Sequence, residues 1–197
     1  MVGGDRRKKS LGAALAGIVV LVALAGCADG ETSAPRAASD VTLAQSKSYA
    51  QLLRNEASSR LPPIVLKEVA RSTDVSVACD DADDDPHGLV RSWTSSTDIL
   101  ITNSTASRIQ EVADDLVESF VAQGWAADTE SASTETLTVT GLSSKASLAS
   151  IEIATASKSE GQAPSIRITA TGVCAVTDGP ESDEVTKLEN QEPANAG

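Results

Sequence analysis

One stretch of the chain repeats apolar residues at the three-to-four-residue spacing of an amphipathic helix. It spans residues 105–123, and its apolar positions are Ile109, Val112, Leu116, Val117 and Phe120. These positions share one helical face, so the stretch is predicted to be a helix with one side in the core. Gly124 suits the left-handed residue that ends a helix, and Trp125 is placed to fold back on the last turn.

A weaker helical pattern covers residues 42–60. Its apolar stripe is partial and consists of Leu43, Leu52, Leu53 and Ala57. Thr42 and Gln45 have the spacing of a capping box, in which the side chain of each accepts the backbone N–H of the other. Pro62 and Pro63 then prevent the helix from continuing. The chain is therefore expected to contain two helices.

Five further segments alternate apolar and polar residues with the period of two that a half-buried strand requires. They are residues 73–79, 89–102, 135–141, 148–156 and 164–174. The residues expected to face the core are Val75, Val77, Cys79, Trp93, Ile99, Ile101, Leu137, Val139, Ile151, Ile153, Ile166 and Ile168. Threonine and serine are frequent on the other face, which is typical of an antiparallel sheet with one side in solvent.

The predicted elements follow the order helix, strand, strand, helix, strand, strand, strand. A sheet with one apolar face and helices with one apolar stripe bury these surfaces most simply in two layers. We therefore expect an α+β two-layer sandwich, with an antiparallel sheet of four or five strands and both helices packed on one face. This single domain is assigned to residues 41–177.

The segments on either side of this domain show no periodicity. Residues 27–40 are mostly small and polar, which is typical of a flexible stalk. Residues 178–197 are rich in Asp and Glu and contain few apolar residues. That composition predicts an acidic, disordered tail.

The first 26 residues have the organisation of an export signal. A basic run at residues 6–9 precedes an uncharged, apolar stretch at residues 11–26. The stretch is short for a membrane-spanning helix, which needs roughly 20 apolar residues. The general and the twin-arginine export routes both stay open, because Arg6-Arg7 lacks the usual neighbours of the twin-arginine motif.

The signal ends in Leu24-Ala25-Gly26-Cys27, which resembles the lipobox of bacterial lipoproteins. The resemblance implies that residues 1–26 are removed and that the Cys27 sulfur receives a diacylglyceryl group. Two or three acyl chains, of the palmitate type, would anchor the protein stably in the cell membrane, with the domain on the extracytoplasmic face. The alternative is an ordinary cleaved signal followed by an unrelated cysteine.

Cys79 and Cys174 remain once Cys27 is assigned to the lipid. An even pair of cysteines in an exported domain is normally bridged, because the compartment is oxidising. Both residues are expected on core-facing sides of strands, so their sulfurs can meet. The disulfide would close a loop of about 95 residues and stabilise the fold by about 4–5 kcal/mol. Two free, buried thiols are the alternative.

The charge of the mature chain limits its partners. Removing residues 1–26 takes away four of the 16 Lys and Arg residues but only one of the 28 Asp and Glu residues, which leaves a net charge of −15. Such a surface repels nucleic acid and anionic lipid head groups, so no nucleic acid is expected as a partner. Only four aromatic residues are present (Tyr49, Trp93, Phe120 and Trp125), too few for a stacking platform.

No motif marks a catalytic or metal site. His87 is the only histidine, which argues against a His-rich zinc site. The acidic segment 80–85 offers carboxylates for Ca²⁺, but the registers that start at Asp81 and Asp83 both fail the EF-hand spacing. A calcium site of another kind stays as the alternative to a solvated turn. Nucleophile elbows and phosphate-binding glycine loops are absent, and no cofactor is predicted.

The combination of lipobox, short stalk, single domain and one cysteine pair is similar to the small lipoproteins of high-GC Gram-positive (actinobacterial) bacteria. That resemblance implies a location rather than an activity. The leading hypothesis is a membrane-anchored, non-enzymatic interaction or accessory module of the cell envelope, whose partner is an envelope protein. The alternative is a carrier or sensor of a small apolar or lipid ligand held between the sheet and the helices.

Overall fold

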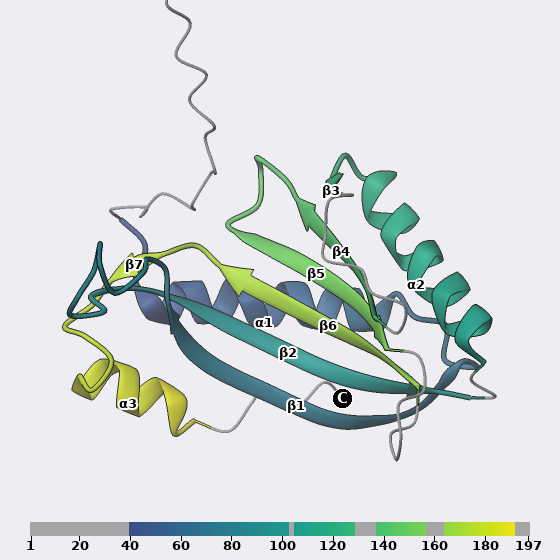
Figure 1. The fold of residues 1–197 in the computed structure, drawn as a ribbon, viewed down its shortest axis with the longest axis horizontal. Coiled ribbons are helices and arrows are strands. Elements are labelled where there is room, and N and C mark those ends of the chain that lie inside the picture. Colours follow the sequence, from purple (N-terminus) through teal and green to yellow (C-terminus); the bar gives the residue numbers. More distant parts are fainter. Residues whose placement is uncertain (1–39, 103–104, 129–136, 157–163, 192–197) are drawn as a thin grey trace, which may run out of the picture. The chain divides into compact units, whose positions relative to one another are not determined.

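The described part of the chain contains one antiparallel sheet of seven strands. The computed structural model describes residues 40–102, 105–128, 137–156 and 164–191. The strands are β1 (Leu66–Ala78), β2 (Val90–Ile101), β3 (Ala126–Asp128), β4 (Leu137–Ser143), β5 (Ala149–Ala156), β6 (Ser165–Gly172) and β7 (Ala175–Val176). They lie in the order β1-β2-β6-β5-β4-β3, and β7 pairs with the start of β2 (Figure 1). The α+β class and the antiparallel sheet are confirmed, whereas four or five strands were too few.

Three helices accompany the sheet in the described residues: α1 (Leu43–Ser59), α2 (Ala106–Val121) and α3 (Asp183–Glu189). The Thr42–Gln45 capping box is present, since the Gln45 N–H donates to Thr42 Oγ1 at 3.2 Å and the Thr42 N–H donates to Gln45 Oε1 at 2.9 Å. Trp125 meets the Phe120 ring edge-on at 5.3 Å between centroids, as expected at the end of α2. The two long helices therefore agree with the sequence prediction.

The central strands bury the residues that their alternation predicts. The buried side chains of β2, β5 and β6 include Trp93, Ile99, Ile101, Ile151, Ile153, Ile166 and Ile168. They share one core with residues of α1 and α2, including Leu43, Leu53, Ile109, Leu116 and Phe120. Both long helices thus cover the same face of the sheet, and burial of each such side chain stabilises the fold by roughly 1.5–3 kcal/mol. The opposite face is called the open face below.

The predicted phase of β1 is wrong. Val75 and Val77 were expected in the core but lie on the open face, and Asp74 and Ser76 point toward the helices instead. Pairing with β2 sets this phase, because Ser76 lies directly opposite Trp93 and opposite residues share a face. The helix-facing side of this edge strand is therefore polar in its second half.

The predicted phase of β4 is wrong for a related reason. Leu137 and Val139 were expected in the core, yet both lie on the open face. Leu142, near the end of the strand, is buried opposite Ile151 and fixes the register. Because side chains alternate along a strand, this register turns the two earlier apolar residues outward.

Two register shifts of the bulge type interrupt β1. One falls between Leu66 and Glu68 and the other between Val69 and Arg71. As a result Leu66 lies opposite Ile101, and Val69 lies opposite the helix-facing Ile99. A bulge inserts one extra residue and changes the side to which the following side chains point. The two shifts therefore direct Leu66 and Val69 to the helix side of the sheet, although they are three residues apart.

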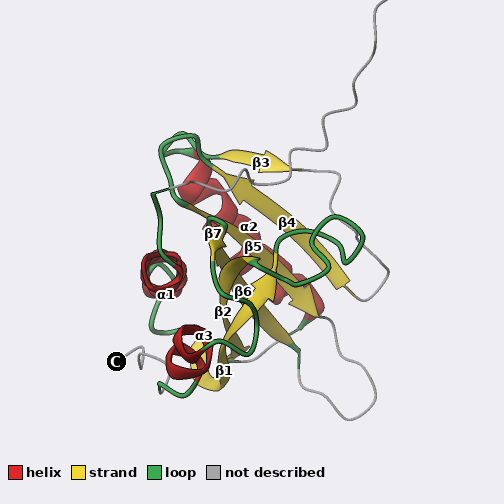
Figure 2. Ribbon diagram, turned by 90° about the vertical axis from the view of Figure 1, so that its left-hand side faces the viewer, coloured by secondary structure: helices red, strands yellow, loops and turns green. Residues whose placement is uncertain are grey.

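The C-terminal segment is structured as far as Gln191, so the prediction of a disordered tail is wrong for residues 178–191. Helix α3 buries Val185 and Leu188 against the common core. The Lys47 ammonium of α1 donates to the Leu188 carbonyl at 2.6 Å, and α1 and α3 lie side by side in Figure 2. Val185 and Leu188 have the spacing of one helical face, but the acidic composition of the segment led to the prediction of disorder.

Several sequence predictions concern residues outside the described part. The signal peptide, the lipobox with Cys27, most of the stalk at 27–40, and residues 192–197 all lie there. Among the described residues, no helix has the length and apolar character needed to cross a membrane.

Candidate functional site

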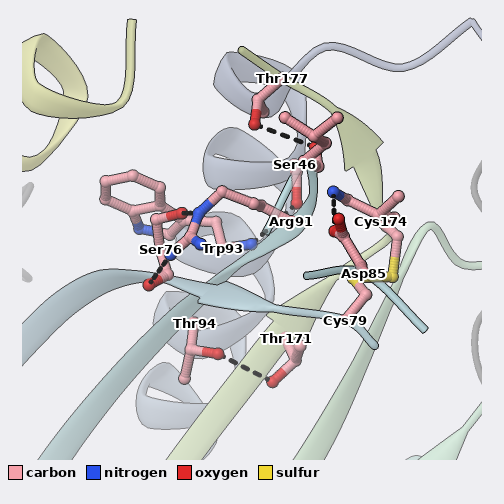
Figure 3. The surroundings of a disulfide bond; sticks show 12 residues. Ser46, Ser76, Cys79, Asp85, Arg91, Trp93, Thr94, Thr171, Cys174 and Thr177 are labelled. Carbon is pink, nitrogen blue, oxygen red and sulfur yellow. Dashed lines mark hydrogen bonds between the residues drawn. A yellow bond between two sulfur atoms is a disulfide. The ribbon is translucent and has the colours of Figure 1, made fainter. Parts of the chain in front are cut away.

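A disulfide joins Cys79 to Cys174, as the sequence predicts. It links the loop after β1 to the short connection between β6 and β7, across a sequence separation of 95 residues (Figure 3). Cys174 is fully buried, as expected, whereas Cys79 was expected to face the core and is partly exposed. A structural bridge of this kind is consistent with an extracytoplasmic location, where thiols are oxidised.

The acidic loop beside the disulfide uses one of its carboxylates internally. Asp85 Oδ2 accepts the Val90 N–H at 2.7 Å (Figure 3). This hydrogen bond, together with those from neighbouring amides of the loop, lowers the pKa of Asp85. No three His, Cys, Asp or Glu side chains within the described ranges come together as a metal site. Asp85 therefore serves to fold the loop back onto β2.

Replacing Asp85 with Asn is expected to destabilise the protein in a pH-dependent manner. A carboxylate whose pKa is lower in the folded state stabilises the fold above its unfolded pKa, near 3.9. That stabilisation disappears as the pH falls through the lowered folded value. Urea unfolding of both proteins should thus show a difference at pH 7 that shrinks steadily below pH 4. A difference that is independent of pH would contradict this role of the carboxylate.

A buried polar cluster lies between α1, the sheet and α3. Asp74 accepts the Trp93 indole N–H at 3.1 Å and pairs with Arg54 at 3.5 Å. Lys47 lies 4.5 Å from the centroid of the Trp93 ring and donates to the Leu188 carbonyl. Burial lowers the pKa of Lys47 and of Arg54, and the charge of Asp74 opposes both shifts. Since the side chains of Arg54 and Asp74 are only 1% and 3% exposed, the cluster holds the layers together and cannot meet a substrate.

The open face carries charges and hydroxyls that are paired with one another. Arg167 donates to both oxygens of Asp98, at 2.6 and 3.1 Å, and Arg71 lies 3.2 Å from the same carboxylate. The hydrogen bonds from Arg167 are the main cause that lowers the pKa of Asp98. Hydroxyl pairs also bridge neighbouring strands, at Thr73–Ser96 (2.7 Å) and Thr94–Thr171 (3.4 Å; Figure 3). These contacts hold the polar side chains of the open face in defined positions.

An apolar groove opens between α1 and the first half of β1, and we call it the α1–β1 groove. It has a volume of about 980 Å³. Its apolar lining comprises Leu52, Leu61, Pro63, Leu66, Val69 and Ile99. Its polar lining comprises Asn55, Glu56, Ser58 and Ser59. Leu52, Leu66 and Val69 remain exposed there although they are aliphatic, which makes this groove a candidate binding site.

Sequence reasoning missed the α1–β1 groove because it depends on the two bulges of β1. The strand was expected to begin at residue 73, so Leu66 and Val69 fell outside it. A spacing of three between apolar residues does not match a regular strand, and that mismatch was the available signal.

The other residues that sequence reasoning considered do not form a site together. His87 is exposed in the acidic loop, and Trp93 is a fully buried core residue. Neither residue lines the α1–β1 groove. Comparison with known proteins gives no match to a family model, to a curated protein or to a solved structure.

Proposed function

We propose that this protein is a lipid-anchored module of the cell envelope that acts by binding and not by catalysis. Cys27 carries the anchor, the stalk separates the domain from the membrane, and the domain presents its binding surfaces on the extracytoplasmic side. The disulfide between Cys79 and Cys174 supports this location. The partner is an envelope protein, and the acidic mature chain excludes nucleic acid.

The main support for a binding role is that the open face of the sheet is uncovered. In the described residues no helix covers it, and α1 and α2 both pack on the opposite side. Its side chains are already fixed by contacts such as Arg167–Asp98 and Thr73–Ser96. A surface that is ordered before binding loses less side-chain entropy on association.

The anchor is tested by replacing Cys27 with alanine. The natural protein is expected in the membrane fraction, and the variant is expected in the soluble extracytoplasmic fraction, because no acyl chain can be attached. Immunoblots of separated fractions measure the distribution. A Cys79→Ala variant is the control, since it also loses a cysteine but keeps the lipobox. Continued membrane retention of the Cys27→Ala variant would refute the anchor.

The open face is tested by a photo-crosslinking amino acid at Thr169, which lies on β6 of that face. A crosslink to one defined envelope protein is expected there, and none at Asp83 in the exposed acidic loop. Equal labelling at both positions, or none at either, would contradict an interface on the open face.

A second candidate function is a carrier or sensor of a small apolar or lipid ligand. The α1–β1 groove favours it, because the volume of about 980 Å³ lies at the upper end of the range for ligand pockets. The groove also lies between a helix and the sheet, where such a ligand would be sheltered on two sides.

A further inference from the structure

The space between α1 and β1 on the helix side of the sheet is covered along the second half of β1 and uncovered along the first half. Near Ser76, α3 closes it: the Ser76 N–H donates to the Glu189 carboxylate at 3.1 Å, and Leu188 is buried. Near Val69, no described element covers the space between α1 and β1, and the α1–β1 groove begins. The bulges of β1 supply this open half with aliphatic side chains.

The lining of the α1–β1 groove indicates the chemistry of its occupant. Every apolar lining residue is aliphatic or proline, and no aromatic ring is present for stacking on a sugar, a base or an aromatic ligand. An unbranched hydrocarbon chain is the ligand class that such a surface fits, because its affinity comes from non-directional burial of methylene groups.

The edge of β1 beside the groove argues against a polypeptide as the occupant. An extended peptide would have to pair its backbone with this edge, since unpaired amides are costly in an apolar groove. The two bulges interrupt a regular ladder between Leu66 and Arg71, and charged residues such as Lys67 and Glu68 lie in the same stretch. Bulges and charges are the features that protect edge strands from pairing. A hydrocarbon chain needs no such backbone partners.

The polar residues at the rim of the groove indicate which head group the bound amphiphile carries. No lining residue is cationic, and the carboxylate of Glu56 is already paired with Arg60, so the lining offers no charge to pair with an ionic head group. The Ser58 and Ser59 hydroxyls donate to backbone carbonyls of α1, which leaves their oxygens able to accept hydrogen bonds. A neutral head group that carries hydroxyls, such as a glycerol ester, matches these acceptors.

We infer that the α1–β1 groove binds the hydrocarbon chain of a neutral, hydroxyl-bearing amphiphile of the monoacylglycerol class. The inference deepens the carrier function named above and rests on it. It is independent of the anchor at Cys27, because the groove is built entirely from the described domain.

The test uses residues 28–197 with the disulfide formed, which contain every described residue and the whole described core but no lipid. Titration calorimetry with 1-monodecanoylglycerol, below its aggregation concentration, is expected to show saturable binding of one molecule per chain. The eight-carbon ester should bind about tenfold more weakly, because two fewer methylene groups are buried. Decanoate, which has the same acyl chain but a negative head group, should bind at least about tenfold more weakly, because no lining residue offers its charge a cationic partner.

Matched substitutions on one strand locate the site. Val69 and Val75 both belong to β1 and are 52% and 44% exposed, but only Val69 lines the groove. Val69→Asp should weaken monodecanoylglycerol binding at least about tenfold, and Val75→Asp should change it less than about twofold. If Val69→Asp fails to fold, Leu52→Gln on α1 replaces it, with Val121→Gln on α2 as the control for an exposed aliphatic residue.

Four results would overturn the inference. They are the absence of saturable binding, equal effects of the two aspartate variants, decanoate binding as tight as that of the ester, and a dimer in sedimentation that Val69→Asp dissociates. The last result would make a second copy of the chain the occupant. Because the protein tested has no anchor, failure here would leave the Cys27 fractionation experiment unaffected.

Discussion

Replacing Asp74 with alanine is expected to lower the free energy of unfolding by about 3–5 kcal/mol. Asp74 is the acceptor of the Trp93 indole N–H and the ion-pair partner of Arg54, and both of these partners are buried. Its removal takes the paired carboxylate away from the buried Arg54 guanidinium, which also donates to Asn55 Oδ1. A loss of this size is a large part of the 5–15 kcal/mol that stabilises a typical domain.

Urea unfolding, followed by far-UV circular dichroism, measures this loss. Asp83→Ala is the control, because Asp83 is exposed in the acidic loop and its replacement should change stability by less than about 0.5 kcal/mol. A double variant, Arg54→Met with Asp74→Leu, should be more stable than Asp74→Ala, since it also removes the buried positive charge. A loss below about 1 kcal/mol for Asp74→Ala would show that the cluster does not hold the layers together.

Loss of the disulfide is expected to cost about 4–5 kcal/mol. The bridge spans 95 residues and encloses β2, α2 and the strands β3 to β6, so its removal frees about half of the chain in the unfolded state. Thermal or urea unfolding of a Cys79→Ala/Cys174→Ala variant measures the effect. Reduction of the natural protein should give the same loss. A loss below about 1 kcal/mol would show that the bridge contributes little to the fold.

The central elements of the fold could be predicted from the sequence because each follows a strong local pattern. The stripe from Ile109 to Phe120 predicts α2, and the alternation around Ile99 predicts β2. These elements lie at the core, where one face carries the large buried apolar residues and the period of the pattern is decisive. The cysteine pair could also be predicted, because Cys79 and Cys174 are the two that remain once Cys27 is set aside as the proposed lipid attachment site.

The edges of the sheet could not be predicted in the same way. At Val75 and Leu137 the apolar residue lies on the open face, because the register with the neighbouring strand outweighs the local pattern. The α1–β1 groove depends on bulges that bring Leu66 and Val69 to one side, and only pairing with β2 reveals them. The α3 helix has two buried apolar residues in an acidic segment, and its stability comes from tertiary contacts such as Lys47 with Leu188.

The chemical state of the mature N-terminus decides whether this protein is an anchored envelope module. The measurement is mass spectrometry of the N-terminal peptide from protein purified from the membrane fraction. We expect the peptide to begin at Cys27 and to carry the added mass of a diacylglyceryl group, with or without a further acyl chain. An unmodified peptide that begins at another residue, or an intact residue 1–26 segment, would contradict it.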